Sequence, residues 1–180
     1  MNSMLLMIIL NGLTQAGLLF MIASGLTLAF GLMKVVNLAH GAFYLLGGFV
    51  GVTVFRITEI WWLALLVGGL FLSLVGLFME KVLLVKVRGD MLSETLLTVG
   101  FSTIIADLTL FIWGGRPLSI PTPDYLNPTI QLFGLYYPGF RLFILLFSIF
   151  IGLLLFALLY KTKLGSIIRE GVDDREIVAA

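Results

Sequence analysis

The sequence predicts an all-α integral membrane protein with about five transmembrane helices, a proline-rich external loop and a short external hairpin. Hydrophobic residues make up 60% of the 180 residues, charged residues only 12%, and the mean hydropathy is +1.13. Soluble domains carry about 25% charged residues. The apolar residues also gather into runs near the roughly 20 that cross a bilayer as a helix. Such continuous runs are too long for barrel strands, which alternate over about ten residues.

The first apolar segment, Met4–Met33, is too long for one upright span at about 1.5 Å of helix per residue. We therefore expect it to tilt, to kink at its glycines or to extend beyond the membrane. A secretory signal peptide carries basic residues before its apolar run, and this segment has none there. We therefore interpret it as a permanent span. The further segments are Val35–Phe55, Ile60–Met79, Leu92–Trp113 and Leu142–Tyr160.

All five prolines fall between Pro117 and Pro138, just before the last apolar segment. Proline interrupts helices, so this stretch is predicted to be a structured loop. Within it, TIQLFGLYY has a central glycine and fits a short hairpin.

Basic residues predict the direction of the chain. If the five segments cross in turn, the 11 basic residues divide into eight on one side and three on the other. Basic residues are enriched on the cytoplasmic side, so the N-terminus and the proline-rich loop are predicted to lie outside. The inner set is Lys34, Lys81, Lys86, Arg88, Lys161, Lys163, Arg169 and Arg175, and the outer set is Arg56, Arg116 and Arg141.

The second segment carries a stripe of polar and small residues. At about 100° per residue, the members of the stripe fall within about 60° of one direction. We expect this face to contact protein or a cavity, with tight helix contacts at Gly41 and Gly48. For Asn37 and His40, a structural contact and a place in a translocation path both remain open. The stripe consists of Asn37, His40, Gly41, Tyr44, Gly48 and Gly51.

Asp107 is the other ionisable residue within a predicted span. It shares a helix face with Gly100 and Thr103, so we expect it to point inward. A role in a translocation path and a carboxylate paired with a neighbour both remain open.

Motifs of common enzyme classes are absent from the sequence. It contains no G-x-x-x-x-G-K-[ST], G-x-S-x-G or H-E-x-x-H pattern. With one histidine and no cysteine, a metal site is not expected. We therefore predict neither an enzyme nor a cofactor.

Four segments in order resemble the permease subunits of bacterial branched-chain amino-acid ABC importers. The NLAHG core with its flanking glycines points to the subunit type with this asparagine–histidine pattern. The segments are GLTLAFGLMKVVNLAHGAFYLLGGFVG, MLSETLLTVGFSTIIADLTLFIWGG, GGRPLSIPTP and YKTKLGSIIREGVDDREIVAA.

The resemblance implies a multi-pass subunit of the bacterial inner membrane that forms a translocation path. Its partners would be membrane lipid, a second permease subunit, two cytoplasmic ATP-binding subunits and a periplasmic or extracellular solute-binding protein, with no nucleic acid. The substrate would be a branched-chain amino acid, although urea and amide importers share the fold. Two alternatives remain: a self-contained channel or secondary transporter, and a membrane subunit with no transport role.

The resemblance also implies that residues 1–180 form a single transmembrane domain that is incomplete at its C-terminus, because members of the family continue into further spans. From about Ser166 the chain resembles the segment that couples to the ATPases. An amphipathic helix on the inner membrane surface is the alternative. The candidate ATPase contacts are Arg169, Asp173, Asp174, Arg175 and Glu176.

Overall fold

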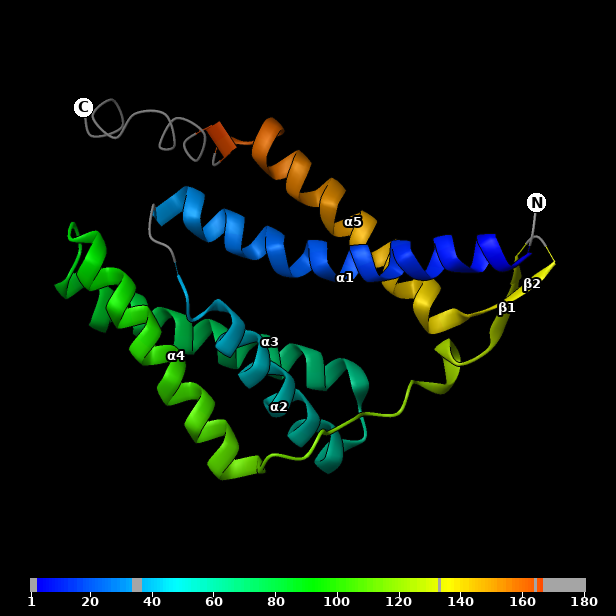
Figure 1. Ribbon diagram of the computed structural model, residues 1–180, viewed down its shortest axis with the longest axis horizontal. Coiled ribbons are helices and arrows are strands. Elements are labelled where there is room, and N and C mark those ends of the chain that lie inside the picture. The colour runs from blue at the N-terminus through cyan, green and yellow to red at the C-terminus, as the bar shows by residue number, and fades with distance from the viewer. Residues whose placement is uncertain (1–2, 34–36, 133, 164, 167–180) are drawn as a thin grey trace. The chain divides into compact units, whose positions relative to one another are not determined.

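The computed structural model describes residues 3–33, 37–132, 134–163 and 165–166 (Figure 1). The chain divides into two compact units. The first unit combines Met1–Lys34 with Thr122–Ala180, and the second unit is Val35–Pro121. Within the described part, five helices are long and apolar enough to cross a membrane, which confirms the predicted fold class. Many of their large apolar side chains are exposed, as expected for surfaces that face lipid or other protein.

Two long helices, α1 (Ser3–Met33) and α5 (Gly139–Lys161), pack together in the first unit. They approach closely where Gly17 meets Ser148, because a Cβ added to Gly17 would collide with the Ser148 hydroxyl. The 31 residues of α1 form one uninterrupted helix. At about 1.5 Å per residue it is about 46 Å long, against a hydrocarbon core of about 30 Å. Of the three outcomes expected for this segment, tilting and extension beyond the membrane therefore remain.

A short hairpin precedes α5, as the sequence predicts. Strand β1 (Thr129–Leu132) pairs antiparallel with β2 (Leu135–Pro138), after the 3₁₀ turn η3 (Asp124–Leu126). Gly134 lies in the turn with φ of 80°, a conformation that glycine adopts without strain.

The second unit consists of α2 (His40–Thr58), α3 (Trp61–Phe78) and α4 (Met91–Trp113), with α2 packed against both of the others. The helix of α3 continues as a π-helical turn, η1 (Met79–Leu83), and a 3₁₀ turn, η2 (Leu84–Lys86).

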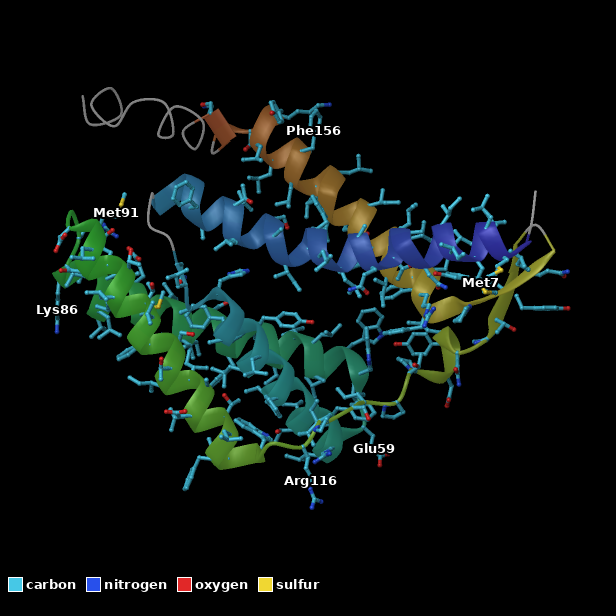
Figure 2. The ribbon with its side chains drawn as sticks, in the orientation of Figure 1. Met7, Glu59, Lys86, Met91, Arg116 and Phe156 are labelled. Carbon is cyan, nitrogen blue, oxygen red and sulfur yellow. The ribbon has the colours of Figure 1, made fainter. Side chains whose placement is uncertain are left out.

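The connections between the helices of the second unit lie at its two opposite ends (Figure 2). Lys86 and Met91 lie at one end, and Glu59 and Arg116 lie at the other. This arrangement agrees with spans that cross in alternating directions.

The predicted start of the second segment is wrong. The second helix begins at His40 and not at Val35, because residues 37–39 form a turn before it. The Asn37 side chain stabilises this turn by accepting a hydrogen bond from the Ala39 N–H. Asn37 therefore precedes the helix and does not share the face on which the sequence placed it.

Candidate functional site

The turn before α2 is built around Asn37, whose side chain is buried with 9% exposed. Its Oδ1 accepts from the Ala39 N–H at 3.0 Å, and its backbone oxygen accepts from the His40 N–H at 3.3 Å. An asparagine side chain that accepts from the backbone N–H two residues later forms an Asx turn, and this turn directly precedes the first residue of α2. Asn37 thus has a clear structural role at the start of α2.

Thr98 on α4 supplies a second acceptor to the same turn. Its Oγ1 accepts from the Leu38 N–H at 3.3 Å and donates to the Thr95 oxygen at 2.9 Å. Thr98 is fully buried, with 0% exposed. It lies seven residues after the first residue of α4, so the turn sits about 10 Å along that helix. A non-helical backbone at such depth is tolerated in membranes where protein or a cavity surrounds it.

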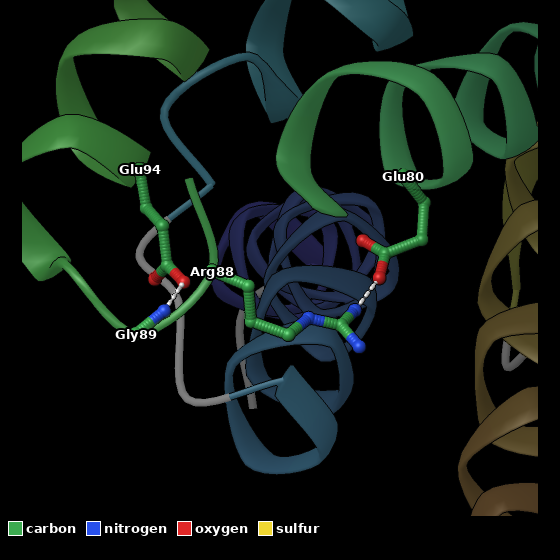
Figure 3. A network of polar contacts seen from close by, with 4 residues as sticks. All are labelled: Glu80, Arg88, Gly89 and Glu94. Carbon is green, nitrogen blue, oxygen red and sulfur yellow. Dashed lines mark hydrogen bonds and ion pairs between the residues drawn. The ribbon is translucent and has the colours of Figure 1, made fainter. Parts of the chain in front are cut away.

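A buried carboxylate lies one helical turn before Thr98. Glu94 is 7% exposed, and its Oε1 accepts from the Gly89 N–H at 2.9 Å (Figure 3). The neighbouring Arg88 forms an ion pair with Glu80, which lies on η1. The loop between α3 and α4 is therefore fixed from both sides, by Glu80 before it and Glu94 after it.

Asp90 caps the start of α4. Its carboxylate accepts from the Ser93 hydroxyl and from the Leu92 N–H. These bonds, the Ser93 bond above all, hold the pKa of the Asp90 carboxyl below its ordinary value of 3.8. A negative charge at this position also interacts favourably with the helix dipole.

Most of the predicted stripe on α2 does not lie on the packed face of this helix. A Cβ at Gly41 or Gly48 would meet no described atom within 4 Å, so the tight contacts expected there are wrong. The close contacts to α3 are made by Gly47, which lies outside the stripe, and by Gly51, which belongs to it. Tyr44 is 63% exposed. A place for Gly41, Tyr44, Gly48 and the half-buried His40 in a translocation path stays a prediction.

Tyr44 and Gly48 do share one feature, an apolar hollow of about 660 Å³ between α2, α3 and the loop that follows α4. Gly47, Gly51 and Gly68 also line it. Gly41 is not among the lining residues.

Asp107 is exposed and does not point into its own unit. At about 100° per residue it lies on the side of α4 opposite Thr98 and Ile105, which are buried. Among the described residues, none forms a hydrogen bond or ion pair with its carboxylate. The inward orientation expected from the sequence is therefore wrong for this unit, and a role in transport stays a prediction.

The candidate ATPase contacts Arg169, Asp173, Asp174, Arg175 and Glu176 lie outside the described residues.

Sequence reasoning missed a polar cluster in the first unit. The Tyr137 hydroxyl lies 3.0 Å from Thr14 Oγ1 and donates to Asn11 Oδ1 at 3.3 Å. Arg141 donates to the same Asn11 oxygen at 2.6 Å. With Tyr137 only 1% exposed, the cluster fixes β2 to α1 and α5. Its signal in the sequence was the pair Asn11 and Thr14, two polar residues three apart in a mostly apolar span.

Comparison with known proteins relates nearly the whole chain to one family. Residues 8–180 match the family described as the permease component of the branched-chain amino acid transport system. The high-affinity branched-chain amino acid transport system permease protein BraD of Pseudomonas aeruginosa is 25% identical over 184 residues, which cover 92% of this chain. The match covers 58% of the relative, so the chain spans little more than half of that protein's length. No solved structure matches the chain.

Proposed function

This chain belongs to the family of branched-chain amino acid transport permease components, and from that premise we propose that it forms part of the translocation path of an ATP-driven importer. The observation that carries the proposal is the family match over residues 8–180. The five apolar helices agree with a membrane permease of the bacterial inner membrane.

The partners follow from this role. A second permease subunit would complete the path, two cytoplasmic ATP-binding subunits would hydrolyse ATP, and a solute-binding protein would deliver the cargo. The chain itself has no G-x-x-x-x-G-K-[ST] motif, which supports placing hydrolysis on other subunits. The cargo is a branched-chain amino acid.

The start of α2 is the part of the second unit best suited to a gate. A turn at residues 37–39 precedes α2 at a level about 10 Å along α4, where Thr98 and Asn37 accept from the Leu38 and Ala39 N–H groups. Transporters use helix N-termini at membrane depth to present backbone groups to a substrate. This supports the assignment of Asn37 and His40 to the path.

The experiment that tests the function is co-purification of the chain with the products of its neighbouring genes, followed by reconstitution. We expect leucine, isoleucine or valine, delivered by the binding protein, to stimulate ATP hydrolysis. Stimulation by urea or short amides alone would show that the cargo is one of these solutes and not a branched-chain amino acid. Assembly without any ATP-binding subunit, together with uptake that needs no ATP, would contradict the proposal in favour of a self-contained transporter.

A second experiment addresses the segment from about Ser166, which we propose couples the permease to the ATPases. Charge reversal at Glu176 or deletion of Asp173–Ala180 should abolish capture of the ATP-binding subunits while membrane insertion persists. A matched charge reversal at Asp124, in the loop before the hairpin, should leave capture unchanged. Unchanged capture after the deletion would contradict the coupling assignment and leave a segment on the membrane surface.

A further inference from the structure

The hollow in the second unit has a mostly apolar lining. It has a volume of about 660 Å³ and lies between α2 and α3, with Pro117, Leu118 and Ile120 of the following loop beside it. Tyr44 and Trp61 supply the polar side-chain atoms of the described lining, and the other lining residues are glycine, proline or apolar. No charged side chain among them could bind an ammonium or carboxylate group.

Glycines create this hollow. The backbones of α2 and α3 approach closely beside the hollow, since a Cβ at Gly68 would lie 3.2 Å from the Gly47 oxygen. Gly48 and Gly69 also line the hollow, and a Cβ on either would meet no described atom within 4 Å. The space therefore exists because these glycines have no side chains, beside a close crossing of α2 and α3.

Size and depth narrow the choice of occupant. The lining extends along α2 from Tyr44 to Val52 and along α3 from Trp61 to Leu72, within two apolar spans. Its volume lies in the range of about 300–1,000 Å³ that is typical of ligand pockets. This volume is far larger than the four-carbon side chain of leucine would fill. A long hydrocarbon chain fits these properties better than a zwitterionic amino acid does.

We propose that the hollow binds an acyl chain of a phospholipid whose phosphate is held by Arg116. Arg116 directly precedes the lining residue Pro117, is exposed, and forms no hydrogen bond or ion pair with any described residue. Its side chain extends away from the ribbon (Figure 2). The guanidinium group suits a phosphate because it offers several N–H donors in one plane.

Aromatic residues mark the same end of the unit as a membrane interface. Trp61 and Trp62 begin α3 and make an edge-to-face contact with ring centres 4.9 Å apart. Tryptophan is enriched at the level of lipid headgroups. A phosphate bound by Arg116 would therefore lie at the level of the lipid headgroups, and the acyl chain would extend past Trp61 into the hydrocarbon layer.

Quenching of Trp61 fluorescence tests the site directly. The chain has three tryptophans, so the replacements Trp62→Phe and Trp113→Phe leave Trp61 as the single reporter. The purified, delipidated chain in detergent is titrated with a phospholipid that carries bromine on its acyl chain. We expect saturable quenching at about one lipid per chain, and several-fold weaker binding after Arg116→Gln.

Two glycines of α3 provide a matched pair of variants. Gly69 lines the hollow and Gly76 does not, and a Cβ at either would meet no described atom. Gly69→Leu should abolish the saturable quenching, and Gly76→Leu should retain it. If Gly69→Leu fails to fold, Gly48→Leu fills the same space from α2 and should have the same effect.

Three outcomes would overturn the proposal. They are quenching that rises without saturation, equal quenching in the Gly69→Leu and Gly76→Leu variants, and displacement of the brominated lipid by free leucine. The last result would assign the hollow to the cargo. None of these readouts depends on transport, so they test the lipid site separately from the proposed function.

Discussion

The Oγ1 of Thr98 on α4 accepts a hydrogen bond from the backbone N–H of Leu38, 60 residues earlier in the chain, at 3.3 Å. This bond joins α4 to the turn that starts α2. One helical turn earlier on α4, Glu94 holds the Gly89 N–H of the preceding loop. One buried face of α4 therefore connects its own N-terminal loop with the NLAHG segment.

Replacing Thr98 with valine should destabilise the protein by about 1–3 kcal/mol, because the Leu38 N–H loses its acceptor in an apolar setting. Valine keeps nearly the same shape, so the change tests the hydrogen bond and not the packing. Unfolding in a detergent titration measures the effect. Thr103→Val is the control, since Thr103 is exposed and donates only within its own helix, to Val99. Equal losses of stability in the two variants would show that the bond between Thr98 and the turn contributes nothing.

The α2–α3 crossing predicts opposite effects at two glycines. A Cβ at Gly68 would lie 3.2 Å from the Gly47 backbone oxygen, which cannot yield without moving α2, so Gly68→Ala should cost about 1–3 kcal/mol. A Cβ at Gly48 would meet no described atom within 4 Å, and alanine favours helix over glycine by up to about 1 kcal/mol, so Gly48→Ala should be neutral or stabilising. Thermal unfolding of both variants in one detergent distinguishes these results, and a destabilised Gly48→Ala beside an unaffected Gly68→Ala would contradict the assigned contact face.

The crossing also shows where sequence reasoning succeeds and fails. Hydropathy and length predicted all five spans, and the glycine in TIQLFGLYY predicted the hairpin, because both signals act locally. The packed face of α2 was placed wrongly because Gly47 and Gly48 are adjacent and equally small. Which of the two meets a neighbour depends on where α3 lies, and that is not a local property.

Two polar residues illustrate the same limit. The spacing of Asn37 from the other polar residues is the same whether it lies on the helix or just before it. The hydrogen bond from the Ala39 N–H, which places Asn37 before the helix, cannot be read from the sequence. Asp107 shares a helical face with Gly100 and Thr103 as predicted, but the partner of α4 is α2, which contacts the opposite face. Periodicity gives the residues that share a face and does not give the direction of that face.

The buried hydroxyl of Tyr137 predicts a further stability difference. Tyr137→Phe removes the hydrogen bonds to Thr14 and Asn11, so the free energy of unfolding should fall by about 0.5–1.5 kcal/mol. Tyr136 is the adjacent residue of β2 and is 66% exposed, so Tyr136→Phe should change stability by less than about 0.5 kcal/mol. Thermal unfolding measures both variants. If the two agree, the hydroxyl cluster does not hold the hairpin to α1.

The direction of the chain in the membrane can be tested with single cysteines, because the natural sequence has none. Ser119 follows α4 and Lys86 precedes it, and both are exposed. The basic-residue distribution predicts that a membrane-impermeant thiol reagent added to intact cells labels Ser119→Cys and spares Lys86→Cys until the cells are opened. The reverse pattern would invert the predicted topology.

The cap at Asp90 predicts a dependence of stability on pH. Hydrogen bonds from Ser93 and Leu92 lower the pKa of the folded carboxyl below 3.8, so the folded state binds its proton less tightly than the unfolded chain does. The stabilisation is therefore fully present above pH 3.8 and is lost as the pH falls through the lower pKa of the folded protein. Asp90→Ala should lower the melting temperature at neutral pH, and the difference from the unaltered chain should shrink in acid. Ser93→Ala removes the largest cause of the shift and should show the same trend with a smaller difference. A gap between Asp90→Ala and the unaltered chain that stays constant from neutral pH to well below pH 3.8 would mean that the charge of Asp90 does not contribute to the cap.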